Sequence, residues 1–155
     1  MKVAVITISD RASKGVYEDL SGPEIEKLLI SKIPSCKIER VIVPDEAEEI
    51  LKALETFKGF DFILTTGGTG IGPRDLTPNI TEQYCDKELP GISETLRAES
   101  LKETNSAMLS RGYSGMKDNT IIVNFPGSVK AVRLCTNVIA PVMVHAVKMV
   151  KGEGH

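Results

Sequence analysis

Histidine and cysteine are scarce in this sequence of 155 residues, and their positions exclude several kinds of site. Of the two histidines, His155 is terminal, and His145 lies in an apolar segment where a core or interface role is expected. Nucleophilic Ser-His-Asp and Cys-His arrangements are therefore excluded. The three cysteines, Cys36, Cys85 and Cys135, are 49 and 50 residues apart, a spacing that indicates neither a disulfide framework nor a Cys-x-x-Cys metal site. We expect a reducing, cytoplasmic location.

The sequence also lacks basic runs and long apolar runs. Its 19 Lys and Arg against 21 Asp and Glu give a net charge of −2, whereas proteins that bind nucleic acids usually carry a basic face. The longest nearly apolar run, residues 138–147, contains Pro141 and is shorter than the roughly 20 residues of a membrane span. The first apolar stretch, Val3 to Ile8, is too short for an export signal. We therefore expect a soluble protein without a nucleic-acid or membrane partner.

The remaining composition is that of an ordinary globular protein. Hydrophobic residues make up 41% of the chain and charged residues 26%, which is enough apolar material for one core. No linker or internal repeat divides the sequence. We expect a single domain over residues 1–155.

Short β-branched runs alternate with segments of helical periodicity along the chain. The runs predict strands at Lys2–Ile8, Lys37–Val43, Asp61–Thr66 and Thr120–Phe125. Capping patterns and apolar spacing predict helices from Ser21 to about Ile33, from Asp45 to Phe57, and over Asn79–Asp86, Ile92–Lys102 and Val129–Val150. Ser21 is expected to cap its helix, Pro90-Gly91 to end the third helix, and Pro141 to kink the last. The alternation predicts an α/β fold, a three-layer α/β/α sandwich with a mostly parallel sheet.

The least ordinary segment follows the third predicted strand and reads GGTGIGPRDLTP over residues 67–78. Four glycines leave the backbone bare, so consecutive N–H groups can surround an oxyanion. The spacing fits neither a Walker A loop nor a GxGxxG dinucleotide motif. A mobile surface turn is the alternative interpretation, but this composition favours a phosphate-binding loop.

Two carboxylates stand where the chemistry is expected. Asp75 follows Arg74, a phosphate donor, inside the glycine-rich loop, and Asp45 ends a neighbouring strand. Two carboxylates and a phosphate would form a Mg²⁺ site. Asp45 begins an Asp-x-x-Glu capping pattern, which could explain it without a metal. Asp75 could instead form an Asx turn or cap the following helix.

The ends of two other strands carry similar residue types. Pro126-Gly127-Ser128 follows the fourth strand and offers open backbone and a hydroxyl, either as a second anion site or as an ordinary strand-to-helix turn. Ser9-Asp10-Arg11 follows the first strand and is equally ambiguous alone. Ligands of parallel sheets bind beyond the carboxyl ends of the strands. The occurrence of such residues after several strands is therefore a stronger signal than the residues after any one strand.

The loop motif, from Thr65-Thr66-Gly67-Gly68-Thr69-Gly70 to Pro73-Arg74-Asp75-x-Thr77-Pro78, resembles the signature of a molybdenum-cofactor biosynthesis family. This family includes MogA, MoaB and the G domain of gephyrin. The rest of the chain agrees in order, with Ile8-Ser9-Asp10-Arg11-Ala12-Ser13, Pro44-Asp45-Glu46, Pro90-Gly91, Leu109-Ser110-Arg111 and Asn124-Phe125-Pro126-Gly127-Ser128. Because the motifs around Asp10 and Asp45 are intact, the chain looks more like the MogA branch, the molybdopterin adenylyltransferases, than like MoaB.

The resemblance implies transfer of AMP from Mg·ATP to the terminal phosphate of molybdopterin, with release of pyrophosphate. It implies that Asp45 and Asp75 are catalytic and hold Mg²⁺. It further implies that the substrates contact Asp10, Gly67, Gly68, Thr69, Gly70, Arg74, Ser100, Ser110, Pro126, Gly127 and Ser128. Such chemistry needs no histidine base, because a phosphate monoester nucleophile is already ionised at neutral pH.

Two departures from the family pattern are visible. Asn79 stands where an acidic residue is common, and Val129 stands where the second turn often continues with Pro. Family members suggest a homotrimer, with a hexamer as the other assembly. The alternative functions are a MoaB-like protein that binds molybdopterin without transferase activity and an oligomeric scaffold.

Overall fold

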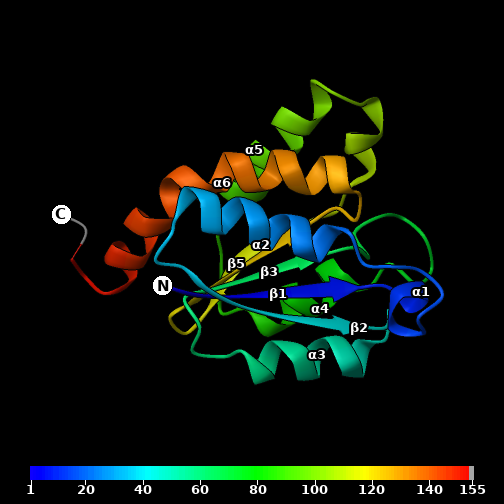
Figure 1. Cartoon of the computed structure of the whole chain (residues 1–155), viewed down its shortest axis with the longest axis horizontal. Coiled ribbons are helices and arrows are strands. Elements are labelled where there is room, and N and C mark those ends of the chain that lie inside the picture. Colours follow the sequence, from blue (N-terminus) through cyan, green and yellow to red (C-terminus); the bar gives the residue numbers. More distant parts are fainter. Residues whose placement is uncertain (154–155) are drawn as a thin grey trace.

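The four predicted strands are consecutive neighbours in a six-stranded sheet in the computed structural model, which describes residues 1–153 (Figure 1). The strand order is β2-β1-β3-β6-β5-β4, and the first four strands are parallel. β1 (Lys2–Ile8), β2 (Lys37–Val43) and β6 (Thr120–Phe125) match the prediction, and β3 (Phe62–Thr66) starts one residue later than predicted. The predicted α/β fold with a mostly parallel sheet is confirmed.

Two short antiparallel strands at one edge of the sheet were not predicted. β4 (Lys87–Glu88) and β5 (Ser114–Lys117) extend the sheet beyond β6. Both are too short and polar to show an apolar pattern. The signal that could have found β5 is the Asp118-Asn119 pair between it and β6, because such pairs favour two-residue hairpin turns, and Asp118 has a positive φ of 51°.

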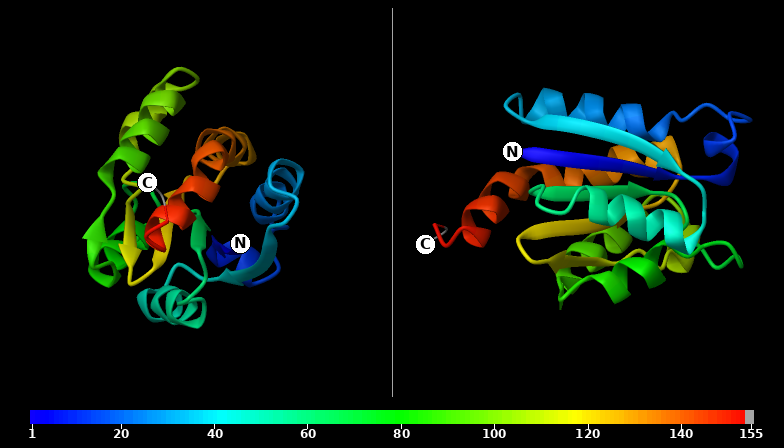
Figure 2. Two further views of the ribbon diagram at one scale, coloured as in Figure 1. Left: turned by 90° about the vertical axis from the view of Figure 1, so that its left-hand side faces the viewer. Right: turned by 90° about the horizontal axis from the view of Figure 1, so that it is seen from below.

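The helices lie in two layers that cover the two faces of the sheet (Figures 1 and 2). α2 (Ser21–Lys32), α5 (Pro90–Leu101) and α6 (Val129–Val150) cover one face, and α3 (Ala47–Thr56) and α4 (Thr77–Tyr84) cover the other. Two short helical segments, α1 (Asp10–Ser13) and the 3₁₀ helix η1 (Asn105–Leu109), were not predicted.

Strand periodicity explains how one sheet serves both layers. Successive side chains of a strand point to opposite faces. In β1, Val3 and Val5 join the core beneath α2 and α6, whereas Ala4 and Ile6 join the core beneath α3 and α4. All four side chains are fully buried, which is why the sequence shows a continuous apolar run rather than alternation.

Several helix boundaries differ from the prediction, and α3 begins at Ala47 rather than at Asp45. Ser21 does not cap α2, because it lies inside the helix and its hydroxyl donates to the Gly127 carbonyl oxygen at 2.6 Å. α4 begins at Thr77, two residues earlier than predicted. Pro90 is the first residue of α5 rather than a break before it, since proline is well tolerated in the first helical turn.

The last helix, α6, is a core element. Val132, Cys135, Ile139 and Met143 form its buried stripe against the sheet. α6 is also long and apolar enough to pass a simple test for a membrane span, a test that core helices pass as well. It continues through Pro141, and its C-terminal turns bend away from the direction of its first turns, in agreement with the predicted kink (Figure 1).

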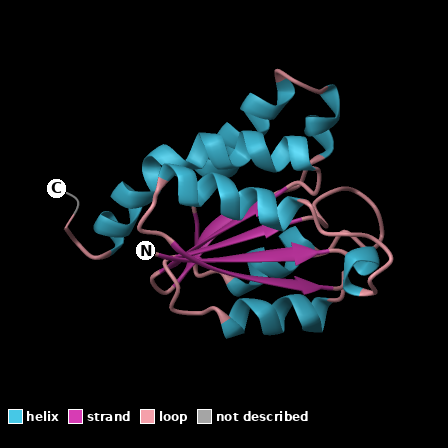
Figure 3. Cartoon of the chain, in the orientation of Figure 1, coloured by secondary structure: helices cyan, strands magenta, loops and turns pink. Residues whose placement is uncertain are grey.

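The parallel strands all point toward the same edge of the sheet, the edge formed by their carboxyl ends, where loops and α1 gather (Figure 3). Four of the predicted site segments follow the ends of β1, β2, β3 and β6 at this edge. The topology therefore brings together residues that are more than one hundred positions apart in the sequence. His155 lies outside the described residues.

Beneath this edge, a buried amide connects three elements. The Asn124 side chain donates to the hydroxyls of Thr65 (2.9 Å) and Thr81 (3.0 Å) and accepts from the Tyr113 backbone N–H (3.0 Å). Asn124, Thr65 and Thr81 are at most 2% exposed, so the two hydroxyls cannot turn to water when the amide is removed. The network fixes β6 against β3, α4 and the chain entering β5.

We predict that Asn124→Leu, which keeps the branched shape of the side chain but not its polar atoms, lowers the free energy of unfolding by about 1–3 kcal/mol, because the buried hydroxyls and the Tyr113 N–H lose their partner. The exposed helix residue Asn137 provides the control: Asn137→Leu should change stability by no more than about 0.5 kcal/mol. Urea denaturation of both variants measures the difference. Equal stabilities would contradict a structural role of the network.

Candidate active site

The glycine-rich loop after β3 begins with two residues in the left-handed region, Gly67 (φ +98°) and Gly68 (φ +68°). A Cβ atom at Gly67 would collide with the Ile8 carbonyl oxygen, and one at Gly68 would collide with the Thr77 hydroxyl. Only glycine meets both demands at these positions, a positive φ and a close approach to neighbouring atoms. The local sequence is therefore fixed by geometry at the first two positions.

Hydrogen bonds hold the base of this loop to its neighbours. Gly67 N–H donates to the Phe125 carbonyl oxygen (3.2 Å), the Thr77 hydroxyl donates to the Gly67 carbonyl oxygen (3.0 Å), and Thr77 N–H donates to that of Gly68 (3.2 Å). Thr69, the next residue of the loop after Gly68, is buried. The base of the loop is thus built into the sheet edge, which argues against a mobile surface turn.

Asp45 and Asp10 bind each other's backbone. The Asp10 N–H donates to Asp45 Oδ2 at 2.9 Å, and the Asp45 N–H donates to Asp10 Oδ1 at 3.0 Å. The helix cap considered for Asp45 is wrong, because α3 begins at Ala47 without any side-chain cap. The other oxygen, Asp45 Oδ1, lies 3.0 Å from an ideal Cβ position at Gly68, so this carboxylate faces the glycine backbone.

Arg74 extends this cluster from inside the loop. Its guanidinium donates to both carboxylate oxygens of Asp10, from Nε at 2.6 Å and from a terminal nitrogen at 3.0 Å. Such a bidentate pair has specific geometry as well as charge. The Arg74 guanidinium lowers the pKa of Asp10. In contrast, burial raises the pKa of Asp45, with repulsion from Asp10 and Asp75 adding to the effect.

Asp75 closes its own turn. Its Oδ2 accepts from the Gly72 N–H at 2.8 Å and lies 3.0 Å from an ideal Cβ position at Gly70. It does not cap α4, whose N-cap residue is Leu76. Asp75 Oδ1 accepts no hydrogen bond within the described part of the chain. Both carboxylates therefore lie beside loop glycines, and each keeps one oxygen without a hydrogen bond in the described part of the chain.

This carboxylate pair suits Mg²⁺ only in company with a substrate. Within residues 1–153, no group of three or more His, Cys, Asp and Glu side chains could hold a metal ion by itself. Mg²⁺ commonly binds through one or two carboxylates and completes its shell with water and substrate phosphates. The free oxygens of Asp45 and Asp75 meet that requirement.

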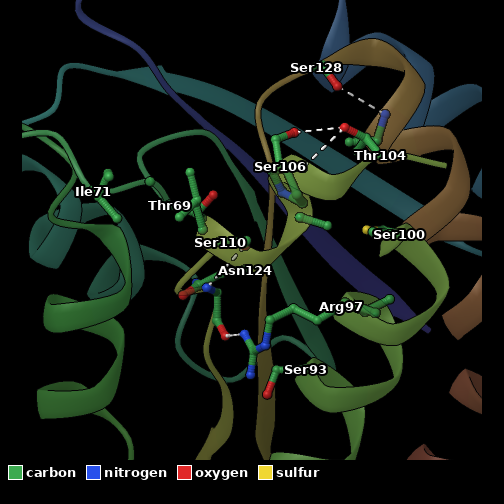
Figure 4. Close-up of a pocket in the computed structure, with 18 residues that line it drawn as sticks. Thr69, Ile71, Ser93, Arg97, Ser100, Thr104, Ser106, Ser110, Asn124 and Ser128 are labelled. Atoms are coloured by element: carbon green, nitrogen blue, oxygen red, sulfur yellow. Dashed lines mark hydrogen bonds between the residues drawn. The ribbon is translucent and has the colours of Figure 1, made fainter. Parts of the chain in front are cut away.

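A cavity of about 360 Å³ adjoins the glycine loop, which contributes Thr69, Gly70 and Ile71 to its lining (Figure 4). Hydroxyl side chains from α5, η1 and the start of α6 line it together with apolar residues. Its hydroxyl-bearing members are Thr69, Ser93, Ser100, Thr104, Ser106, Ser110 and Ser128. Of the described residues that line the cavity, Arg97 is the one with a charge. The cavity therefore offers hydrogen-bond partners and one cation but no carboxylate.

The structure sorts the predicted site residues into three groups. The cavity is lined by Thr69, Gly70, Ser100, Ser110, Pro126 and Ser128. The charged cluster contains Asp10, Asp45, Arg74 and Asp75. Gly67, Gly68 and Gly127 lie between them: an ideal Cβ at Gly127 would sit 3.4 Å from Gly67 Cα. The glycine loop thus separates a charged cluster from a cavity, and it contributes residues to both.

Ser128 has a structural role in addition to its place in the cavity. Its hydroxyl caps α6 by accepting from the Ala131 N–H at 3.1 Å, as the ordinary-turn interpretation predicts. Its hydroxyl hydrogen is still available to a ligand. The two interpretations of the Pro126-Gly127-Ser128 turn therefore do not compete.

Sequence reasoning gave no site role to two arginines, although one of them, Arg111, stands in the Leu109-Ser110-Arg111 motif. Arg97 donates to the Gly112 carbonyl oxygen at 2.6 Å and reaches into the cavity from α5 (Figure 4). Arg111 binds the glycine loop through backbone and guanidinium N–H groups. Neither stands at the end of a parallel strand, where site residues were sought. Arg97 shows its place in the site only through its partly buried position on α5, which the structure reveals and the sequence does not.

We predict that Arg74→Gln raises the pKa of Asp10 toward its ordinary value, because the paired cation that lowers it is lost. The pKa of Asp45, which Arg74 also lowers, should rise further. Arg133→Gln is the matched control: it should raise the pKa of Glu24, its own partner, and leave Asp10 unchanged. Carboxyl NMR titration measures all three groups, and an unmoved Asp10 would contradict the ion pair.

Comparison with known proteins agrees with this geometry. The family model described as "Probable molybdopterin binding domain" matches residues 4–145. The molybdopterin adenylyltransferase of Helicobacter pylori is 39% identical over 156 residues, which span 97% of this chain and 88% of that protein.

Two solved structures are similar over nearly the whole chain. A structure of MogA superimposes with a TM-score of 0.90 at 35% identity and covers 97% of this chain and 99% of its own. The structure of MoaB from Thermus thermophilus has a TM-score of 0.88 at 37% identity and covers 97% of this chain and 96% of its own. With a family model that matches most of its length, the chain belongs to the MogA and MoaB family of molybdopterin-binding domains.

Proposed function

We propose that this protein is a molybdopterin adenylyltransferase that transfers AMP from Mg·ATP to the terminal phosphate of molybdopterin. The observation that carries the proposal is the division of the site by the glycine loop. The Asp45 and Asp75 carboxylates lie beside the loop glycines, and a hydroxyl-lined cavity adjoins the same loop without either carboxylate in its lining. Two substrates with different chemistry, a nucleotide and a pterin, fit these two environments.

The absence of a base from the cavity lining fits this reaction. An oxygen of the molybdopterin phosphate attacks the α-phosphorus of ATP, the bond from that phosphorus to the bridging oxygen breaks, and pyrophosphate leaves with the electron pair. The nucleophile is already an anion, so the residues must align two anions and offset their repulsion. Arg97 in the cavity and the loop N–H groups supply positive potential for this purpose.

We propose that Asp45 and Asp75 hold Mg²⁺ together with the ATP phosphates, where the ion would neutralise charge that builds on the phosphate oxygens. Asp10 keeps Asp45 oriented through their two backbone hydrogen bonds. Gly67 and Gly68 let the loop approach the nucleotide. Ser100 and Ser110 donate to the pterin side, with Pro126, Gly127 and Ser128 forming the opposite wall.

The second candidate is a MoaB-like protein that binds molybdopterin without transferring AMP, a possibility raised by the similarity to the Thermus thermophilus MoaB structure. The carboxylates favour the enzyme, because a pterin-binding protein does not require the arrangement of Asp10, Asp45 and Asp75. A homotrimer, or a hexamer, in the cytoplasm is also proposed. The three cysteines, which are all free in the structure, support a reducing location.

The decisive experiment measures pyrophosphate release from Mg·ATP with and without molybdopterin. The wild-type protein should release pyrophosphate only when both substrates are present. Asp45→Asn and Asp75→Asn should each reduce kcat at least ~100-fold, because each loses a charge needed at the phosphates. Asn can still accept the N–H groups of Asp10 and Gly72, so Tm should stay near the wild-type value.

Glu48→Gln is the control, because it removes one exposed carboxylate from α3, close in sequence to Asp45. This variant should keep wild-type turnover. Binding of molybdopterin without pyrophosphate release by the wild-type protein would favour the MoaB-like alternative. Near-normal turnover of Asp75→Asn would remove Asp75 from the mechanism.

A second prediction tests the loop as the nucleotide site. Gly68→Ala places a methyl group against the Thr77 hydroxyl and 3.0 Å from Asp45 Oδ1. We expect the Kd for a nonhydrolysable Mg·ATP analogue to rise at least ~10-fold in calorimetric titration. Gly59→Ala introduces the same kind of φ strain (φ +98°) at a position where the methyl group meets no atom within 4 Å. Gly59→Ala should lower stability and leave the Kd unchanged.

A further inference from the structure

Arg111 makes four hydrogen bonds to the glycine loop and the helix that follows it. Its backbone N–H donates to the Thr69 carbonyl oxygen at 2.8 Å, and its Nε donates to that of Gly70 at 2.8 Å. Its two terminal nitrogens donate to Asn79 Oδ1 at 3.0 Å and to the Asp75 carbonyl oxygen at 2.5 Å. One residue therefore holds both ends of the segment from Gly70 to Asp75.

This segment determines where the Asp75 carboxylate lies. Between the two held carbonyls, Asp75 Oδ2 accepts from the Gly72 N–H, so the turn is closed from inside by the carboxylate and from outside by Arg111. If the guanidinium moved, the distance between the ends of the turn would change. The free oxygen of Asp75 would then move relative to that of Asp45.

Arg111 is also attached directly to the cavity wall. Residues of η1 line the cavity, and so does Ser110, the residue immediately before Arg111. The Ser110 hydroxyl additionally accepts a long hydrogen bond from the Gly112 N–H (3.4 Å), on the far side of Arg111. A ligand that shifts or fixes Ser110 must therefore act on the Arg111 backbone, which is bonded to Thr69.

The guanidinium charge is not consumed by these contacts. All four partners are neutral oxygens, and Arg111 forms no ion pair within residues 1–153. Arg74, the other arginine at the loop, is bound to Asp10. Arg111 therefore adds positive potential to the loop while it holds the loop in place.

From these contacts we infer that Arg111 is a positioning residue that couples the two halves of the site, so that molybdopterin in the cavity tightens nucleotide binding at the loop. The inference rests on the proposed function for the identity of the two ligands. Coupling of this kind is reciprocal: the nucleotide must tighten molybdopterin binding by the same factor. An ordered loop would thus be completed only when both substrates are present.

Arginine is required for this role by the geometry of its donors. The planar guanidinium reaches three acceptors on different parts of the chain at once, whereas the lysine ammonium is a single point charge on a flexible stem. Arg111→Lys keeps the charge and removes the simultaneous contacts. This substitution therefore separates positioning from electrostatics.

The experiment uses the full chain and measures the Kd of a nonhydrolysable Mg·ATP analogue with and without saturating molybdopterin. In the wild-type protein, molybdopterin should lower this Kd at least ~5-fold, the lower end of typical coupling. In Arg111→Lys the ratio should fall below about 2, while the Kd for molybdopterin alone stays within about twofold. Turnover assays of the same variant at saturating ATP should show a KM for molybdopterin that rises by about the factor lost from the coupling ratio, because the coupling is reciprocal.

Two further variants control for an effect on folding. Asn79→Ala removes one of the four contacts from an exposed helix position and should reduce the coupling ratio partly, without a loss of Tm. Arg133→Lys changes another exposed arginine, which is paired with Glu24 on α2, and should keep the full ratio.

Each outcome is informative. The inference is overturned if molybdopterin does not change the Kd of the nucleotide analogue in the wild-type protein. It is also overturned if Arg111→Lys and Asn79→Ala both keep the coupling ratio of the wild-type protein, even when Arg111→Lys lowers Tm. Loss of coupling in Arg111→Lys with intact coupling in Arg133→Lys supports it. Binding is measured without turnover, so absence of pyrophosphate release from the wild-type protein would count against the proposed function and leave the coupling result valid.

Discussion

The close contact between Gly67 and the Ile8 carbonyl oxygen is the constraint on which the site depends. β1 and β3 are neighbouring parallel strands, so their ends leave the sheet side by side. The chain after β3 can turn across the end of β1 only without a side chain and with a positive φ. This turn brings the loop beside Asp10 and Asp45, which follow β1 and β2, and leaves its far side open to the cavity.

The charged groups at this edge hold one another in position. Arg74 binds Asp10, Asp10 and Asp45 bind each other's backbone, and one oxygen of Asp45 stays free beside Gly68. The opposite pKa shifts of the two aspartates follow from this arrangement. Asp10 is paired with a cation and exposed enough to stay charged, whereas Asp45 is more buried and lies near other carboxylates. One aspartate supports the structure of the cluster, and the other has an oxygen left for a ligand.

A reaction between two anions suits such a site better than acid–base catalysis does. The cavity holds hydroxyls and Arg97 but no group of the kind that takes protons near neutral pH. What the protein can supply is alignment and neutralisation, and both require a loop whose shape is fixed. The hydrogen bonds of Thr77 and Arg111 to loop carbonyls provide this fixed shape from two directions.

By itself, the sequence determined the parallel strands, the glycine-rich loop and the residues at the strand ends, since burial periodicity and backbone freedom are local properties. The short strands β4 and β5 were missed because they show no apolar pattern, and α1 and η1 were missed because they are too short to show helical periodicity. Tertiary structure alone decided that Asp45 binds Asp10 and does not cap α3, and that Arg97 and Arg111 belong to the site. The physical reason is that each of these contacts joins segments far apart in the chain, where a side chain's partner depends on the fold around it and not on its sequence neighbours.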